Sequence, residues 1–269
     1  MTTDFAAELA LAVEAARGAG AIQLERYERL ERIVHKGPKD VVTEVDHLCE
    51  ELILGTIRRR FPDDAIVAEE SGEHRSGRGK GAHASEGAGR AWVVDPLDGT
   101  VNYANGVPLF CVSIGFVLDG RPTVGVVYDP MRDELFSAVA GWGAQLDSQP
   151  IRMPDKERLE DCLIALAMPW TGYRRRESAI RRATRVSRNL GSAALALAYV
   201  ANGRFDVFVQ VRSLSNWDVA AAGLIAEEGG ATVTDPAGGP WYDARRRSRG
   251  VSVVAATPRH HPTILGLIR

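Results

Sequence analysis

Two carboxylates, Asp95 and Asp98, stand three residues apart in the stretch 91–108. Two acids on one rigid turn repel each other unless a cation neutralises them, and carboxylates, carbonyls and water are ligands that suit Mg²⁺. Gly99 and Thr100 follow and predict the start of a helical turn, whose free N–H groups could hold an anion such as phosphate. Cation ligands beside an anion site indicate metal-assisted phosphoryl chemistry.

The local sequence predicts how this turn is built. Ala91 to Val94 is apolar and partly β-branched, as in a short buried strand. Pro96 has no N–H to donate, so we expect the strand to end there. Taken alone, the same residues could form an ordinary surface turn, because Asp, Pro and Gly are common turn formers.

Other acids also stand at the ends of expected strands and helices. They are Asp40 with Asp46, Glu69 with Glu70, and Asp218 in the segment Asn216-Trp217-Asp218-Val219-Ala220-Ala221. A lone acid near a helix start commonly interacts with the helix dipole, so none of these positions indicates a metal by itself. Their number and placement make a shared metal site the interpretation to test.

Composition narrows the classes of protein. The chain has 269 residues, with 45% hydrophobic and 25% charged residues, as in a soluble globular protein. Lys and Arg total 33 against 35 Asp and Glu, which argues against a nucleic-acid partner. Three scattered cysteines, an acidic N-terminus and the lack of a long apolar run predict free thiols, no export signal, no membrane partner and a cytoplasmic location.

Hydrophobic spacing predicts helices and strands that alternate at both ends of the chain, with antiparallel hairpins between them. Helices are expected over residues 4–30, 191–200 and 217–228. Another helix should follow the acids at 40–46 and end at about residue 60, and a last one should begin after a cap at Thr257. Residues 71–90 are expected to be a loop and 174–189 a basic helix, or a helix plus a strand. The order favours a layered α/β or α+β fold over a simple doubly wound sheet.

Five motifs together resemble the inositol monophosphatase family of lithium-sensitive, Mg²⁺-dependent phosphatases. They occur in family order at residues 40–46, 68–71, 92–103, 191–194 and 217–221. The resemblance implies one domain over residues 1–269, with an α+β part to about 150 and an α/β part from about 151. It also implies an α/β/α/β/α sandwich, a homodimer and a small phosphorylated substrate.

The resemblance further implies the metal ligands. Glu69, Asp95 and the carbonyl of Leu97 correspond to ligands of one Mg²⁺, and Asp95, Asp98 and Asp218 to ligands of a second. A third, weaker Mg²⁺ would depend on Glu69, so two or three ions are expected. Four clustered carboxylates would repel strongly without such cations.

The family mechanism is direct attack by water, with two metals holding the attacking and leaving oxygens. Carried over by motif, Thr100 would orient the water with help from Glu69, and Asp46 would hold the Thr100 hydroxyl. The remaining substrate contacts implied by the motifs are the N–H groups of Gly99 and Thr100 for phosphate, with Asp98 and Asp218 nearby. Gly191, Ser192 and Ala193 would line the alcohol side.

One departure weakens the implied choice of inositol 1-phosphate. Inositol-specific members carry a Glu on the strand before the Trp-Asp motif, whereas here Gln210 is the nearest counterpart and one extra residue follows it. A Gln can hydrogen-bond a hydroxyl group but carries no charge. Histidinol phosphate, fructose 1,6-bisphosphate and 3′-phosphoadenosine 5′-phosphate, which related enzymes hydrolyse, therefore stay open as substrates.

Other functions fit the sequence less well. A haloacid-dehalogenase phosphatase needs Asp-x-Asp-x-Thr, and the spacing from Asp95 to Thr100 is one residue too long. Ser113 lacks the first Gly of a serine-hydrolase motif, and the histidines show no zinc-site spacing. A relative that binds metal and ligand without turnover is the non-catalytic alternative.

Overall fold

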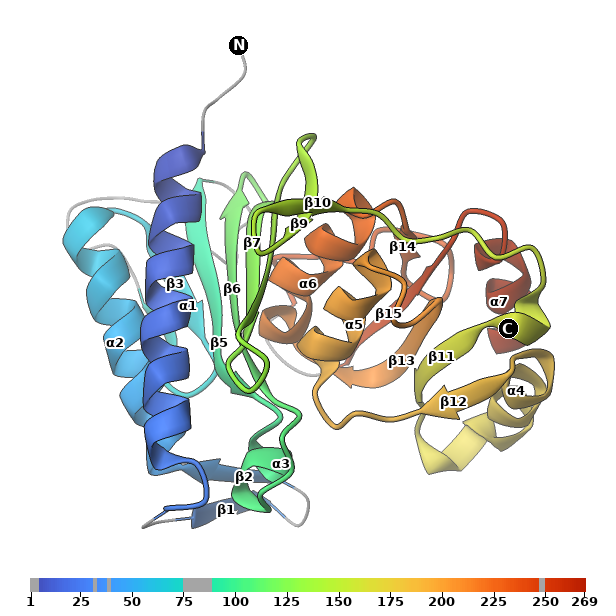
Figure 1. The fold of residues 1–269 in the computed structure, drawn as a ribbon, viewed down its shortest axis with the longest axis horizontal. Coiled ribbons are helices and arrows are strands. Elements are labelled where there is room, and N and C mark those ends of the chain that lie inside the picture. The colour runs from blue at the N-terminus through green and yellow to red at the C-terminus, as the bar shows by residue number, and fades with distance from the viewer. Residues whose placement is uncertain (1–4, 31–32, 38–39, 75–88, 247–249) are drawn as a thin grey trace.

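The structure, a computed structural model, describes residues 5–30, 33–37, 40–74, 89–246 and 250–269. Its elements stack in five layers (Figure 1). Helices α1 (Ala6–Arg26) and α2 (Glu44–Arg60) cover one face of an eight-stranded sheet, and α5 (Ala193–Ala201) and α6 (Asn216–Glu228) lie between this sheet and a five-stranded one. Helices α4 (Trp170–Ala183) and α7 (His261–Ile268) cover the outer face. The expected α/β/α/β/α sandwich is confirmed.

The eight-stranded sheet is largely antiparallel, with one parallel pair at the strand that carries Asp95 and Asp98. Strand β5 pairs in parallel with β3 and antiparallel with β6. In spatial order the strands are β10 (Gln149–Ile151), β9 (Gly143–Leu146), β8 (Glu134–Val139), β7 (Arg121–Asp129), β6 (Cys111–Leu118), β5 (Arg90–Asp98), β3 (Ala65–Ala68) and β4 (Gly72–His74).

The second sheet is mixed, and its strand β13 carries Gln210. In spatial order its strands are β12 (Val186–Arg188), β11 (Leu163–Ala167), β13 (Val207–Leu214), β15 (Val251–Ala256) and β14 (Thr232–Thr234). A separate ribbon of β1 (Ile33–Gly37) and β2 (Asp40–Thr43) leads into α2. Short α3 (Thr100–Ala104) follows β5, and a 3₁₀ turn spans Leu159–Asp161.

Four apolar clusters among the described residues hold the layers together, the smallest of them where Ala220 of α6 packs on β3, β5 and β6. One lies between α1, α2 and the first sheet, one surrounds α5 and α6, and one lies beneath α4 and α7. The three cysteines are free and buried within them. No helix in the described part of the chain is both long enough and apolar enough to cross a bilayer.

Several local expectations need correction. Strand β5 does not end at Pro96 but continues to Asp98, because the pairing with β6 shifts register between Asp95 and Asp98 and no N–H is required of Pro96 there. The last helix begins at His261, and Thr257 instead accepts an N–H bond from His260 in the preceding turn. Helix α1 ends at Arg26, not at residue 30.

Two further expectations concern segments at 71–90 and 174–189. The first is not wholly a loop, because residues 72–74 form β4 and residue 90 starts β5, while residues 75–88 lie outside the described part. The second is a helix plus a strand, as one of the two alternatives predicted. Residue 4, where the first helix is expected to begin, also lies outside the described residues. The division of the chain at about residue 150 stays a prediction.

Candidate active site

Asp95, Asp98 and Asp218 come together at the end of β5 and the start of α6. Each offers a carboxylate oxygen, and these oxygens lie within 4.8 Å of one another. Asp95 is 1% exposed and Asp98 is 9% exposed, whereas Asp218 is more accessible. Hard oxygen ligands at this spacing suit a small divalent cation such as Mg²⁺.

The electrostatics of the cluster also fit bound cations. Burial raises the pKa of Asp95 well above its usual range, and repulsion from Glu69, Asp98 and Asp218 raises it further. The contact between the carboxyl groups of Asp95 and Glu69 adds to the rise in the pKa of Asp95. Protons or metal ions must therefore relieve the repulsion, and Glu69 belongs electrostatically to the same cluster.

The turn after β5 is possible only because Gly99 adopts a left-handed conformation. Its φ is +98°, and a Cβ at this position would lie 2.9 Å from the carbonyl oxygen of Leu109. Gly99 is the N-cap of α3, so Thr100 begins that helix as expected. The Leu97 carbonyl accepts a hydrogen bond from the Thr100 hydroxyl at 2.9 Å.

Asp46 holds Thr100 from the first turn of α2. Asp46 is fully buried, and its Oδ2 accepts bonds from the N–H and hydroxyl of Thr43 in a capping box. Its Oδ1 accepts a 2.9 Å bond from the Thr100 hydroxyl. That hydroxyl has one proton for two acceptors, so donation to Asp46 leaves the Leu97 carbonyl free for another partner.

Asp98 is oriented by the start of α5. Its Oδ2 accepts bonds from the Ser192 hydroxyl at 2.5 Å and from the Ala194 N–H at 2.7 Å. Burial raises the pKa of Asp98, although these bonds lower it. The expected alcohol-side residue Ser192 therefore also contacts a metal-ligand candidate.

Glu69 follows β3, and its N–H donates to the Val94 carbonyl on β5 at 3.2 Å. Glu50 of α2 fixes the same turn, because its carboxylate accepts 2.9 Å bonds from the N–H groups of Glu70 and Ser71. Asp218 stands in the first turn of α6 and closes a second capping box with Ser215. Separate helices thus orient acids that lie far apart in the sequence.

A cavity of about 500 Å³ opens beside the acids. Asp98 and Asp218 reach its wall from the metal-ligand side, and Gln210 and Ser213 reach it from β13. The remaining residues of the expected site that line it are Gly191, Ser192 and Ala193, together with Arg188 and Asn189. The polar groups in its mixed lining suit a hydroxylated phosphate ester.

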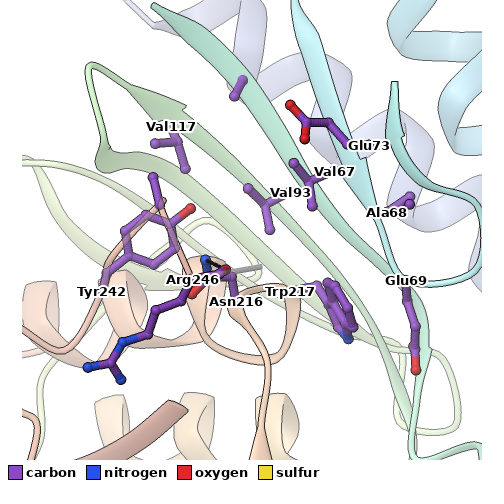
Figure 2. Close-up of a pocket in the computed structure, with 13 residues that line it drawn as sticks. Val67, Ala68, Glu69, Glu73, Val93, Val117, Asn216, Trp217, Tyr242 and Arg246 are labelled. Carbon is purple, nitrogen blue, oxygen red and sulfur yellow. Dashed lines mark hydrogen bonds between the residues drawn. The ribbon is translucent and has the colours of Figure 1, made fainter. Parts of the chain in front are cut away.

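A second cavity of about 380 Å³ has a different lining (Figure 2). Val67, Val93 and Val117 form its floor, with Tyr242 and Trp217 beside them. Glu69 stands at one edge, and its carboxylate points away from the valines. Because apolar side chains dominate this floor, the first cavity is the better match for a phosphorylated polyol.

A bulge in β13 after Gln210 accounts for the extra residue in this region. Pairing of β13 with β15 shifts register between Gln210 and Leu214, and Arg212 adopts a φ of +59°. The Gln210 amide donates to the Ser213 hydroxyl at 3.0 Å. The bulge therefore adds Ser213 to the cavity beside Gln210.

The sequence analysis did not identify residues that fix the backbone around the site by hydrogen bonds. Asn102 donates 2.7 Å bonds to the carbonyls of Leu109 and Leu190, which ties α3 to the segment before Gly191. Gly191 has a φ of +75°, and a Cβ there would lie 2.7 Å from Asn102. Asn102 could have been suspected because it lies in the motif at 92–103, whereas Glu50 lies outside every motif.

Comparisons with known proteins agree with this geometry. Residues 6–269 match the inositol monophosphatase family. The chain is 38% identical over 262 residues to "Inositol monophosphatase 3" of Solanum lycopersicum, covering 94% of this chain and 92% of that protein. It is also 38% identical over 271 residues to "Nus factor SuhB" of Escherichia coli, covering 97% and 95%.

Solved structures show the same fold. The extragenic suppressor protein suhB of Bartonella henselae aligns with a TM-score of 0.88 and 32% identity, covering 98% of this chain and 99% of that chain. SaIMPase-II with bound inositol monophosphate aligns with a TM-score of 0.79 and 28% identity, covering 97% and 92%, and was also solved with 2′AMP. The chain belongs to the inositol monophosphatase family, whose members are phosphatases.

Proposed function

We propose that this chain is a Mg²⁺-dependent phosphomonoesterase that hydrolyses a small polyol phosphate, with inositol 1-phosphate as its first substrate. The observation that carries the proposal is the cluster of Asp95, Asp98 and Asp218 beside the 500 Å³ cavity. Inositol monophosphate and 2′AMP bound to SaIMPase-II support a small phosphorylated substrate for the family.

The clustering of Asp95, Asp98 and Asp218 and the family membership support the ligand assignment. Glu69, Asp95, the Leu97 carbonyl, Asp98 and Asp218 would hold two or three Mg²⁺ ions. When bound, the metal would neutralise phosphate charge and lower the pKa of a coordinated water. The raised pKa of Asp95 supports this assignment, because bound cations would replace the protons that the cluster otherwise needs.

The chain's own residues would prepare the attack on phosphorus. Asp46 accepts a hydrogen bond from the Thr100 hydroxyl, which leaves the lone pairs of the Thr100 oxygen free to accept a hydrogen bond from the attacking water. Glu69 would accept from the same water and take its proton. The N–H groups of Gly99 and Thr100, at the start of α3, would bind phosphate oxygens.

The leaving alcohol would occupy the other part of the cavity. Gly191, Ser192 and Ala193 would line it, and Gln210 would hydrogen-bond a substrate hydroxyl. Because Gln210 and Ser213 carry no charge, they could also accommodate a substrate with a second phosphate near Arg188. Fructose 1,6-bisphosphate, 3′-phosphoadenosine 5′-phosphate and histidinol phosphate are therefore the alternatives.

Phosphate release tests the proposal. The purified chain is compared on the four phosphate esters with Mg²⁺ and with EDTA, and kcat/KM is measured for each. Mg²⁺-dependent release with inositol 1-phosphate as the best substrate is expected. A different best ester would change the substrate assignment, and no turnover of any ester would favour a metal- and ligand-binding relative. Sedimentation would test the homodimer that the family resemblance implies.

A further inference from the structure

Gln23, in the last turn of α1, is a buried polar residue that no motif includes. It is 0% exposed, and its amide nitrogen donates to the Pro96 carbonyl oxygen at 2.8 Å. The orientation of the amide is fixed, because a carbonyl can only accept and Nε2 must face it. The other amide atom, Oε1, has no hydrogen-bond partner among the described residues.

A buried amide with an unused acceptor is a poor choice for packing alone. Leu or Met would fill the same space without a desolvated polar atom. What the amide adds is one donor, aimed at Pro96. Gln23 therefore donates a hydrogen bond to the Pro96 carbonyl, and the buried, unpaired Oε1 lowers the stability of the α1 interface.

The Pro96 carbonyl lies in the part of β5 where regular pairing is interrupted. The register with β6 shifts between Asp95 and Asp98, and Pro96 itself is buried. A buried carbonyl in such an irregular segment needs a hydrogen-bond donor from elsewhere. Gln23 supplies it from a helix 73 residues away in the sequence.

The peptide that Gln23 holds is also the peptide that orients Asp95. Its carbonyl belongs to Pro96, and its N–H belongs to Leu97 and donates to Asp95 Oδ1 at 3.0 Å. Because a peptide unit is planar, fixing the carbonyl end also fixes the direction of the N–H. Rotation of this plane would displace both the Asp95 carboxylate and the Leu97 carbonyl that follows.

A second bond ties the same residue to α3. The Tyr103 hydroxyl donates to the backbone carbonyl of Gln23 at 2.7 Å, and Tyr103 is 1% exposed. Gln23 thus contacts the metal-binding turn at Pro96 and the helix that starts at Thr100. Helix α1 contributes no candidate metal ligand, but through Gln23 it is hydrogen-bonded to the turn at residues 95–98 and to α3.

We propose that Gln23 is a positioning residue for the metal-binding turn, acting through the Pro96–Leu97 peptide on Asp95. The inference rests on the proposed function for its consequence in catalysis. Its consequence for metal binding can be measured without substrate. Residues that orient metal ligands typically change metal affinity or activity by about 10–100-fold when they are replaced.

The first test replaces the amide donor by a side chain of similar length. Calorimetric titration of the metal-free full chain with Mg²⁺ alone compares wild type, Gln23→Met and the control Tyr128→Phe, which removes a 2.9 Å bond between β7 and Asp133. Gln23→Met should weaken Mg²⁺ binding about tenfold and lower kcat, while Tyr128→Phe binds as wild type does. Gln23→Met binding within about twofold of wild type overturns the proposal.

A second variant covers the case in which Gln23→Met does not fold. Gln23→Leu is a second apolar side chain that lacks the donor. It should also weaken Mg²⁺ binding about tenfold, and affinity within about twofold of wild type overturns the proposal. If wild type binds Mg²⁺ but hydrolyses no ester, the proposed function fails while these affinity comparisons still decide the role of Gln23.

Discussion

The Thr100 hydroxyl lies 2.9 Å from Asp46 Oδ1, although 54 residues separate the two in the sequence. Asp46 is fully buried and uses its other oxygen to cap α2, so its position is set by the helix itself. The acceptor is therefore fixed before any substrate binds, and it controls where the Thr100 proton points. A hydroxyl held in this way can accept a hydrogen bond from a neighbouring water.

The Thr100 hydroxyl should therefore matter to turnover more than to stability. Thr100→Val should lower kcat by about 100-fold, because the water loses its acceptor, whereas Thr100→Ser should keep most of the activity. Phosphate release at saturating Mg²⁺ checks both variants, with thermal melts to establish that they fold. Equal losses for Ser and Val would argue against a role for the hydroxyl.

Removing one carboxylate from the cluster should lower activity but raise the stability of the metal-free chain. Asp95→Asn keeps the size of the side chain but deletes a charge that Glu69, Asp98 and Asp218 repel. Activity should fall by more than about 100-fold. In EDTA the melting temperature should rise by about 2 °C, because about 1 kcal/mol of repulsion is relieved. Retained turnover would contradict the metal assignment.

The pH dependence of stability should reveal the same repulsion. The pKa values of Asp95 and Asp98 are raised in the folded chain, so folding takes up protons at these sites. Their stabilising contribution is full below the unfolded pKa of about 4 and is lost as the pH rises through the raised values. In EDTA, the melting temperature should therefore fall as the pH rises above about 4.

Magnesium should counteract that loss. At a concentration about 100 times its Kd, Mg²⁺ should raise the melting temperature at about pH 8 by about 5 °C, and by less at about pH 5 where protons compete. Thermal melts at both pH values, with and without Mg²⁺, provide the measurement. Asp95→Asn is the matched control and should show a flatter pH dependence. If Mg²⁺ raised the melting temperature equally at both pH values, protons and Mg²⁺ would not compete for the cluster, and the prediction would be wrong.

Gly99 tests whether the turn itself is needed. Its φ of +98° is unfavourable for a residue with a side chain. In addition, a Cβ on Gly99 would lie only 2.9 Å from the Leu109 carbonyl oxygen. The control is Gly141, which has a φ of +80° but no atom within 4 Å of such a Cβ. Gly141→Ala should cost about 1 kcal/mol from strain alone. Gly99→Ala should cost more in a denaturant titration and should also lower kcat.

The acids of the site could be predicted because the motifs that carry them are local. Asp95, Asp98 and Thr100 lie within six residues, and the short-range pattern of turn and helix start determines their placement. The layered fold could be predicted because stretches with helical hydrophobic spacing alternate along the chain with stretches typical of strands. What the sequence did not reveal is the continuation of β5 past Pro96, because a register shift depends on the partner strand.

Gln23 and Glu50 show why support residues are harder to find. Each acts on a turn that is distant in the sequence, and each bond exists only after the helices pack. A weak signal was present, since Gln23 continues the buried stripe of α1 that includes Leu11, Ala15 and Ala19. A polar residue on such a stripe is worth testing, but the sequence alone does not identify its partner.

Gln210 should influence which substrate the cavity prefers. Its amide donates to Ser213, and Arg188 is a cationic residue in the same lining. Gln210→Glu places a negative charge there, which should repel a second phosphate by about 1 kcal/mol and lower kcat/KM for fructose 1,6-bisphosphate about fivefold relative to inositol 1-phosphate. Ser213→Ala removes the hydrogen bond without adding charge and should leave that ratio unchanged. If both variants shift the ratio equally, the hydrogen bond and not the charge controls substrate choice.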